Sequence, residues 1–445
     1  MRVLLLVDHK WRDLPGAAWL ALAGERRGHR VRLVRNGFHW ETAWRLRPDV
    51  VVVNHLLEAP HRQQMMALAQ LGVDTVVLPT EGIPTLTGVR DLHAGVGADY
   101  SSVARFCAWN QPMHDRMVEL GVMPAERIPV VGVPRFDLYR PPLDRLLPDR
   151  RSVCQTFGLD PNRPVVVWAT NFPAAGSWER DPYFYRHDWR RLGLDRTLGD
   201  CETFCLADIR CRDASLAAVC SLVERMPAVQ VLVKPHPGDD LGWFRKHMAG
   251  FPTGRAALVE QAYIWEVLPA ADVLVKRSCT TGVEAWILGQ RTIELQPDPA
   301  MHYYSPEHAA GSHMATDADA LVRLVTAAIA GEPESQSVLA ARQAFISRWC
   351  FRADGRSTER FLDVLDGLAA ERAAAGRSPA APDRCAFQAP IMRVMRQAVL
   401  SFHDYRLHDR RLYGRSGLDR LGRLDKWHRD RDAEPWFDRM DPLFA

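Results

Sequence analysis

The sequence has little of several features that would assign a protein to a specialised class. Its 57 Lys and Arg residues nearly balance 54 Asp and Glu residues, which leaves a formal net charge of +3. No overall electrostatic field therefore attracts nucleic acid. No apolar run approaches the ~20 residues of a membrane-spanning helix. The first apolar run, residues 3–7, is too short for a secretory signal and lacks a small-residue cleavage site. We expect a cytoplasmic protein that could still associate with the inner face of the cell membrane.

The cysteines also lack a pattern. They are nine, an odd number without paired spacing, which fits a reducing compartment better than a disulfide framework. Cys201, Cys205 and Cys211, with Cys220 further on, do not follow the Cys-x2-Cys spacing of zinc sites, and no His lies among them. We predict buried single cysteines, no metal site and no bound cofactor.

Short apolar runs alternate with helical patterns along most of the 445 residues. Runs of this kind are typical of parallel strands that are buried on both faces. The clearest are residues 3–7, 31–34, 49–53 and 75–78, followed by 165–169, 229–233, 273–276 and 291–295. The alternation predicts the α/β class, with two Rossmann-like, doubly wound domains and a crevice between them.

Composition divides the chain into four predicted parts. These are an N-terminal domain for an acceptor (1–140), a C-terminal domain for a nucleotide donor (160–340), helices that pack back across the domains (341–375) and a charged helical tail (385–445). We expect residues 173–200 to form an irregular, mobile loop. In the tail, Arg and Asp alternate with aromatic residues, so a solvated helix is expected, docked by Trp427, Trp436 and Phe437 on the body or on a partner.

The stretch Val231-Leu-Val-Lys-Pro-His-Pro-Gly238 is the first candidate site. The two prolines end the strand, which places Lys234 and His236 at its carboxyl end, where open α/β sheets bind ligands. Lys234 would bind a phosphate, and His236 can donate a hydrogen bond to a phosphoryl oxygen or protonate it as it leaves. Alternatively, His236 only caps the next helix.

A second candidate site follows the next long strand. Ser278, Thr280, Thr281 and Gly282 lie at the predicted start of a helix, where free N–H groups and the helix dipole favour a phosphate. Plain N-capping by the hydroxyls explains the same residues. Glu284 could reach ribose hydroxyls, or it could be a first-turn carboxylate stabilised by the dipole.

Polar residues that follow strands of the first half provide a candidate base for removing a proton from an acceptor hydroxyl. Glu81, in Thr80-Glu-Gly82, is the first candidate, and a turn residue paired with an Arg such as Arg90 is the alternative. Asp8 and His9 are the second candidates, and Asp13 is a weaker one.

Two further residues complete the candidates. Asn171 could touch donor phosphates or the base, or form an Asx cap. Arg135 lies near the hinge between the halves, on the acceptor side, and could pair instead with Asp137.

The order of these motifs resembles a bacterial family of surface carbohydrate biosynthesis proteins. The matching motifs, over roughly residues 1–370, are Val7-Asp8 with Arg12-Asp-Leu-Pro15, Pro79-Thr-Glu-Gly82, Gly132-Val-Pro-Arg-Phe-Asp137, Ala169-Thr-Asn-Phe172, Lys234-Pro-His-Pro237, Ser278-Cys-Thr-Thr-Gly-Val-Glu284 and Asp354-Gly-Arg-Ser357. The Lys-Pro-His-Pro and hydroxyl-rich turns are also similar to those of polysialyltransferases, Kdo transferases and CDP-glycerol glycerophosphotransferases. The resemblance implies a glycosyltransferase-B (GT-B) fold, with a CMP-sugar donor in the sialyl and Kdo enzymes. It also implies an acidic-Gly turn as the base, although one Glu stands here where some relatives have two acids.

From residues and resemblance together we expect a glycosyltransferase of surface polysaccharide, as in capsule or lipopolysaccharide synthesis. It would move a sugar from a nucleotide-sugar donor to a cell-surface glycan or lipid-linked acceptor, by inverting, metal-independent transfer. The alternatives are a CDP-polyol phosphotransferase, a nucleotide-sugar 2-epimerase, and a non-catalytic subunit of a membrane-associated polysaccharide assembly complex.

Overall fold

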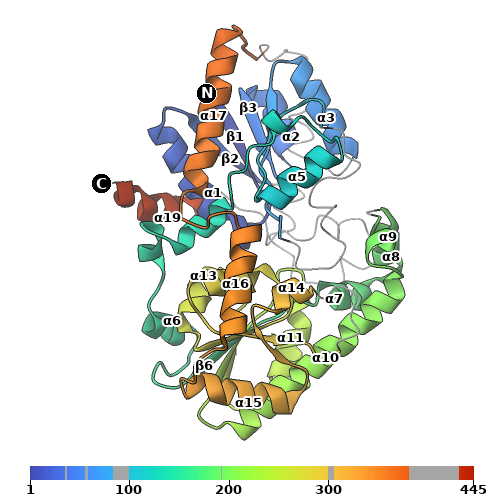
Figure 1. Ribbon diagram of the computed structural model, residues 1–445, viewed down its shortest axis with the longest axis vertical. Coiled ribbons are helices and arrows are strands. Elements are labelled where there is room, and N and C mark those ends of the chain that lie inside the picture. Colours follow the sequence, from blue (N-terminus) through green and yellow to red (C-terminus); the bar gives the residue numbers. More distant parts are fainter. Residues whose placement is uncertain are drawn as a thin grey trace.

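A computed structural model describes residues 1–35, 38–55, 59–83, 100–191, 193–298, 305–379 and 430–444. The chain forms two α/β domains, drawn one above the other in Figure 1, each built on a parallel sheet. Parts of the predicted tail, including Trp427, and the alternative partner Arg90 lie outside the described residues.

The N-terminal sheet has the strand order β2-β1-β3-β4-β5, with every pair parallel. Its elements are β1 Arg2–Val7, α1 Lys10–Arg26, β2 Arg30–Arg35, α2 His39–Leu46, β3 Val50–Val53, α3 Ala59–Gln70, β4 Asp74–Val77, β5 Val103–Phe106 and α5 Gln111–Glu119. Alternate residues of β1 enter different cores: Leu4 and Leu6 pack toward α2, α3 and α5, whereas Val3 and Leu5 pack on the other face. Burial on both faces explains why these strands are continuous apolar runs.

The C-terminal sheet has the order β11-β10-β9-β6-β7-β8. Its strands are β6 Val165–Ala169, β7 Gln230–Lys234, β8 Ala256–Leu258, β9 Val273–Lys276, β10 Thr292–Leu295 and β11 His313–Ala315. Its helices are α6 Arg150–Thr156, α7 Pro173–Arg180, α8 Pro182–Arg191, α9 Leu194–Thr197, α10 Cys201–Arg225, α11 Leu241–Met248, α12 Ile264–Val267, α13 Thr280–Ile287, α14 Pro306–Ala309 and α15 Ala318–Ile329. The strand order reverses beside β1 in one domain and beside β6 in the other. Open α/β sheets bind ligands at the carboxyl ends of strands at such switch points.

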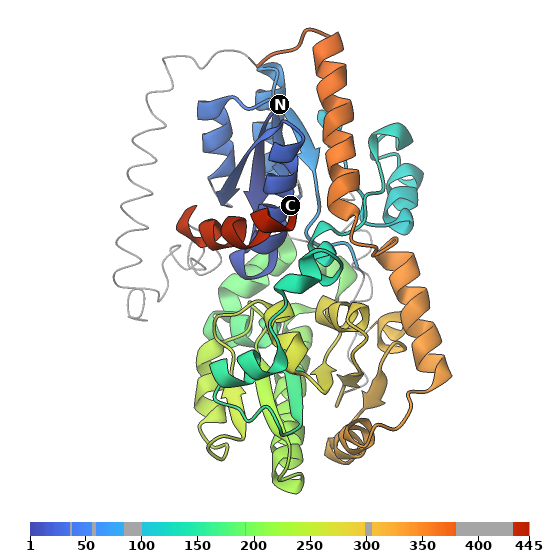
Figure 2. The ribbon, with the colours of Figure 1, turned by 90° about the vertical axis from the view of Figure 1, so that its left-hand side faces the viewer.

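Two helices after the second domain return to the first. α16 (Gln336–Trp349) lies on the C-terminal domain, and α17 (Ser357–Ala374) covers the open face of the N-terminal sheet (Figures 1 and 2). Phe361, Leu362 and Leu365 of α17 are buried in the core that contains Val3 and Leu5, and each such burial stabilises the fold by roughly 1.5–3 kcal/mol.

The first turn of α17 is capped by the connection between the domains, the 3-10 helix η2 (Pro134–Tyr139). Asp137 accepts hydrogen bonds from the backbone N–H groups of Ser357 (3.1 Å) and Thr358 (2.7 Å). Burial raises the pKa of Asp137 to about 6, against the lowering effect of these bonds. Asp137 therefore caps the N-terminus of α17. Arg135 makes other contacts, which are described below.

A last helix, α19 (Asp430–Met440), continues into the short 3-10 helix η8 (Asp441–Phe444). It lies beside α1, and Trp436 is buried against the body. The expectation that Trp436 and Phe437 dock a helix on the body is confirmed for this part of the tail.

Three expectations about local structure are wrong. Residues 173–200 are mostly helical, as α7, α8 and α9, because their aromatic residues are packed: Trp189 is buried against Phe204. The sequence pattern predicts a helix over residues 17–27, ended by Gly28, but α1 begins at Lys10 and contains Pro15. The apolar pattern of residues 127–131 also predicts a last strand of the first half, but the structure has only an isolated bridge there, between Ala108 and Val130.

The cysteines follow the prediction. Cys201, Cys205 and Cys211 are buried and unpaired on α10, and Cys220 is a half-buried single residue on the same helix. Among the described helices, none is long and apolar enough to cross a membrane.

Candidate active site

A cleft of about 260 Å³ lies between the two domains, at the carboxyl ends of their central strands. Most predicted site residues line it, namely Asp8, His9, Glu81, Arg135, Lys234, His236, Thr280, Thr281 and Glu284. The remaining predicted residues do not line it, namely Ser278, Gly282, Asn171 and the weaker candidate Asp13.

The loop after β7 is held by a half-buried carboxylate. Asp239 accepts hydrogen bonds from the backbone N–H groups of Phe172 (2.7 Å) and His236 (3.1 Å), and from the hydroxyl of Thr170. Burial raises the pKa of Asp239 to about 6, although these hydrogen bonds lower it. Sequence reasoning missed Asp239, which ties the loop that carries His236 to the end of β6.

The contacts of His236 define its tautomer. Its Nδ1 accepts a hydrogen bond from the backbone N–H of Gly238 at 3.0 Å, so neutral His236 carries its proton on Nε2. The imidazole is therefore a donor at Nε2, on an exposed side chain that lines the cleft. The alternative that His236 caps the next helix is wrong, because Asp240 is the N-cap of α11 and the contact with Gly238 lies in the turn before that helix.

Lys234, two residues earlier, is a half-buried ammonium in the same cleft. Burial lowers its pKa to about 8, and the negative charges of Asp239 and Glu284 offset only part of this effect. Its Nζ donates to the carbonyl oxygen of Pro235 at 3.2 Å. An anion in the cleft would restore the charge that burial disfavours.

The N-terminus of α13 opens on the same cleft. Thr280 and Thr281 line it, and the Nη2 of Arg135 lies 3.4 Å from the hydroxyl of Thr280. Arg135 also donates to the carbonyl oxygen of Thr80 at 2.7 Å. A helix N-terminus beside a cation is a favourable place for a phosphate.

Ser278 and Gly282 support this helix from behind. Ser278 is buried at φ +31°, and both its N–H and its hydroxyl donate to Glu294, at 2.6 and 3.2 Å. Glu294 also forms a fully buried ion pair with Lys276. A Cβ on Gly282 would lie 2.7 Å from Cε of Lys276, so only glycine lets α13 pass this close. The structure thus gives both residues an internal role.

Asn171 joins the loops that follow β6 and β9. Its side-chain amide donates to the carbonyl oxygens of Ser278 (3.2 Å) and Arg277 (3.4 Å), and Arg277 donates to the backbone carbonyl of Asn171 at 3.0 Å. This is a bridge between two loops rather than the Asx cap considered above.

Glu284 lies on the face of α13 that meets the first domain. It accepts a hydrogen bond from the hydroxyl of Tyr139 at 2.8 Å and lies 3.5 Å from Nε of Arg135. Burial raises its pKa above the ordinary value, and Arg135 and Tyr139 partly oppose this. Glu284 is therefore a contact between the domains as well as a lining residue.

Arg12, which sequence reasoning had not singled out, connects the carboxylates of the first domain. Its guanidinium donates to Asp8, Glu81 and Asp13, each at 2.8 Å. Burial by itself would lower the pKa of Arg12. The surrounding carboxylates outweigh burial and raise this pKa, and Asp13 has the largest effect among them. Glu81 remains largely exposed, at 61% of its side chain. The signal that was available is the motif Arg12-Asp-Leu-Pro15, which lies shortly after β1 and in the first turns of α1.

His9 and Asp13 shape the start of α1. The Nδ1 of His9 accepts from the backbone N–H of Trp11 at 3.2 Å, and Asp13 accepts from the backbone N–H of His9 at 3.0 Å. His9 is thus the N-cap of α1 and also lines the cleft.

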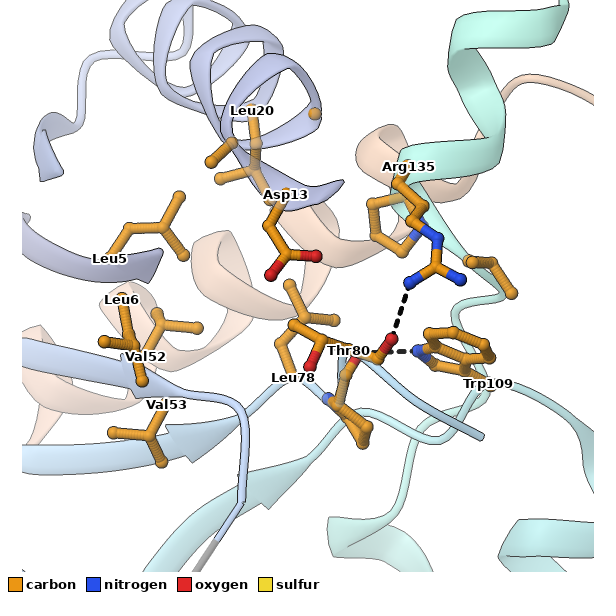
Figure 3. A pocket seen from close by; sticks show the side chains of 15 residues that line it. Leu5, Leu6, Asp13, Leu20, Val52, Val53, Leu78, Thr80, Trp109 and Arg135 are labelled. Carbon is orange, nitrogen blue, oxygen red and sulfur yellow. Dashed lines mark hydrogen bonds between the residues drawn. The ribbon is translucent and has the colours of Figure 1, made fainter. Parts of the chain in front are cut away.

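A smaller cavity of about 60 Å³ lies behind Thr80 in the first domain (Figure 3). Its walls are mainly apolar, from Leu5, Leu20, Val52 and Leu78, and Asp13, Thr80 and Arg135 provide its polar edge. The indole N–H of Trp109 donates to Pro79 and closes one side. Arg135 also lines the cleft, so it separates the two spaces.

Aromatic residues from both domains form a further side of the cleft, here called the aromatic wall: Trp11, Tyr263 and Trp265. The ring centroid of Trp11 lies 5.3 Å from that of Tyr263, and Tyr263 lies 6.3 Å from Trp265. Trp11 and Trp265 line the cleft, and Tyr263 is the N-cap residue of α12. Among the described residues, no group of three or more His, Cys, Asp or Glu side chains could hold a metal ion.

No family model matches the chain, and no curated protein matches its sequence. Solved structures match it in fold. A complex of MnaA from S. aureus with UDP gives a TM-score of 0.54 at 10% identity and covers 83% of this chain and 96% of that one. The UDP-GlcNAc 2-epimerase from Neisseria meningitidis, bound to UDP-GlcNAc, gives 0.51 at 11% identity, over 82% and 100% of the chains. The wall teichoic acid polymerase TagF, soaked with CDPG, gives 0.53 at 12%, over 84% and 90%.

These similarities cover both domains and most of each matched chain. At such low identity, a likeness of this kind establishes architecture and leaves chemistry to the residues. The chain has the predicted fold: two Rossmann-like α/β domains in the GT-B arrangement.

Proposed function

We propose that the protein is a glycosyltransferase that moves a sugar from a nucleotide-activated donor to a surface glycan or lipid-linked acceptor. One observation carries the proposal. The interdomain cleft brings Lys234, His236 and the N-terminus of α13 from one domain into the same space as the carboxylates that Arg12 holds on the other. Sugar transfer needs donors aimed at the phosphate and a base near the acceptor, because charge develops on the leaving phosphate while the acceptor hydroxyl loses a proton.

The donor would bind the C-terminal domain. Its phosphates would meet the ammonium of Lys234, the Nε2–H of His236 and the first N–H groups of α13, with the hydroxyls of Thr280 and Thr281 beside them. Structures of similar fold were solved with UDP, UDP-GlcNAc or CDPG, which supports a nucleotide-linked donor. We propose metal-independent transfer, in which Lys234, His236 and the N-terminus of α13 offset the phosphate charge.

The acceptor would bind the N-terminal domain, with Glu81 as the base. Its carboxylate takes the proton of the acceptor hydroxyl as the oxygen attacks the anomeric carbon, and the bond between that carbon and the phosphate oxygen breaks. Lys234 and His236 stabilise the nucleotide that leaves. A single displacement of this kind inverts the configuration of the sugar. Arg12 positions Glu81 through their 2.8 Å contact.

The test measures nucleotide release from CMP-, CDP-, UDP- and GDP-activated sugars in the presence of glycan and lipid-linked acceptors. Glu81→Gln should lower kcat by roughly 10²–10⁴-fold, the usual contribution of a positioned base, with donor affinity unchanged. Glu119→Gln is the matched control, because Glu119 is also an exposed Glu paired with an Arg, at 2.9 Å from Arg116. For His236→Asn the control is His187→Asn, an exposed His on α8.

The outcomes separate the alternatives. Full transfer by both the Glu81 and the His236 variants would refute the assignment. Conversion of the donor sugar without an acceptor would indicate an epimerase, and transfer of a polyol phosphate from a CDP-polyol would indicate a phosphotransferase. If the wild-type protein consumes no donor, a non-catalytic assembly role becomes the better explanation.

A further inference from the structure

α19 contacts the N-terminal domain through its charged residues and through η8. Asp441 pairs with Arg26 at 2.7 Å, and Asp432 with Lys10 at 3.8 Å. The ring of Phe444 stacks on Trp19 at 4.4 Å between centroids. All three partners, Lys10, Trp19 and Arg26, belong to α1, so α19 is fixed along that helix.

The other face of α19 meets the C-terminal domain. Trp436, 5% exposed, packs edge-on against Tyr263 at 5.2 Å and lies 5.4 Å from Trp265. Arg439 lies over the ring of Trp436, 4.6 Å from its centroid, and donates to the carbonyl oxygen of Leu146 at 3.0 Å. One helix thus joins two domains that belong to distant parts of the sequence.

The partners of Trp436 are residues of the aromatic wall. Tyr263 touches Trp11 of the first domain, and Trp265 lines the cleft directly. Trp436 therefore packs on the side of the wall that faces away from the ligand space. Without Trp436, the buried rings of Tyr263 and Trp265 would leave an apolar patch at the boundary between the domains.

α19 differs from the two crossing helices. α16 and α17 lie at one side of the domain boundary, and α19 lies at another (Figure 2). α17 covers the N-terminal sheet and does not belong to the core that contains Trp265, whereas Trp436 does. Only α19, among the described helices that follow β11, joins α1 to the aromatic wall.

We propose that α19 is a positioning element of the active site: Trp436 braces the aromatic wall across the domain boundary and thereby holds the cleft at the width that binds a nucleotide. The link to nucleotide binding rests on the proposed function, whereas the brace between the domains does not. Trp436 does not line the cleft. Its removal should therefore weaken nucleotide binding by lowering the fraction of molecules whose cleft is competent to bind.

The experiment uses the full chain with Trp436→Ala, Trp436→Phe and the control Glu434→Ala, which changes an exposed residue of the same helix. Calorimetric titration with CMP, CDP, UDP and GDP gives the affinity, and small-angle X-ray scattering of the free protein gives the radius of gyration. If Trp436→Ala leaves about a tenth of the molecules competent, the apparent Kd rises about tenfold. Trp436→Phe should recover most of the affinity, and Glu434→Ala should equal the wild type.

A larger radius of gyration together with weaker nucleotide binding supports the proposal. Trp436→Ala that binds as tightly as the wild type would overturn it, and so would weaker binding with an unchanged radius of gyration. If the wild type binds none of the four nucleotides, the proposed function fails, and the scattering alone decides whether α19 braces the domains. Circular dichroism checks the fold. If the Ala variant does not fold, Trp436→Leu replaces it, because Leu keeps part of the apolar volume but lacks the ring, and the same two outcomes support or overturn the proposal.

Discussion

Lys234 should make nucleotide binding depend on pH in the alkaline range. Burial lowers its pKa from the ordinary 10.5 to about 8, a difference that corresponds to roughly 3 kcal/mol. Below pH 8 the free protein already carries the ammonium that a phosphate needs. Above pH 8 the free protein loses this proton, and binding must first take it up again.

The affinity for CDP should therefore fall by about tenfold between pH 7 and pH 9, because roughly a tenth of Lys234 is charged at pH 9 in the free protein. The terminal phosphate of CDP, with a last pKa of about 6, is already mostly ionised at pH 7, and its remaining ionisation up to pH 9 would strengthen binding and not weaken it. Lys234→Met should bind CDP more weakly at pH 7 and show no such decrease. Titration calorimetry measures both, and near pH 8 the wild type should also take up protons on binding.

Stability should change in the opposite sense. Below pH 8 both the folded and the unfolded chain carry the Lys234 proton, and the full cost of burying this charge destabilises the folded protein. The unfolded chain keeps the proton up to about pH 10.5, so this destabilisation disappears as the pH rises from 8 to 10.5. Lys234→Met should raise the free energy of unfolding at pH 7 by up to roughly 3 kcal/mol. Lys246→Met, at an exposed position on α11, is the control. A CDP affinity that stays constant from pH 7 to 9, or a decrease that persists in Lys234→Met, would refute the reasoning.

Two further substitutions test the support of the site. Gly282→Ala should lower the free energy of unfolding by roughly 1–3 kcal/mol, because its Cβ would press on Lys276; Gly367→Ala, on an open face of α17, should be neutral or stabilising in the same denaturation assay. Arg12→Lys should lower kcat by roughly tenfold or more while donor affinity is kept, because one ammonium cannot reproduce the fork that holds Glu81; steady-state kinetics that match the wild type would contradict this.

The fold was readable from the sequence because its strands are buried on both faces. The run at residues 165–169 is apolar throughout and became β6, and the prolines beside His236 ended β7 at Lys234 as expected. The carboxyl ends of parallel strands share one edge of a sheet, so the candidate residues that follow strands could be assigned to one cleft.

The contacts within that cleft could not be read in this way. Arg12 and Glu81 are 69 residues apart, and Tyr139 and Glu284 are 145 residues apart. The first pair depends on how the segments that follow β1 and β4 meet within one domain, and the second depends on how α13 meets the connection between the domains. No local pattern records either arrangement. The same applies to Ser278, whose hydroxyl was expected at a phosphate but donates to Glu294 on the neighbouring strand.

Prediction from local patterns also failed where a high content of aromatic residues hid the helical periodicity. Residues 173–200 combine Trp, Tyr and Phe with charges and a proline at each of two helix starts, so they were taken for a loop. Their aromatic side chains are what the helices bury, as the contact of Trp189 with Phe204 shows. Tertiary packing overrode the weak local signal.

The ion pair of Lys276 and Glu294 has a consequence for how this chain can change over evolutionary time. Both side chains are fully buried, so the loss of either one alone leaves an uncompensated charge, at roughly 3–5 kcal/mol. Replacement of both by apolar residues of similar volume is often neutral, but it would release Ser278 from Glu294. Each single replacement is therefore unfavourable, and the double replacement removes the acceptor of Ser278, so descendants that keep this turn should keep both ions.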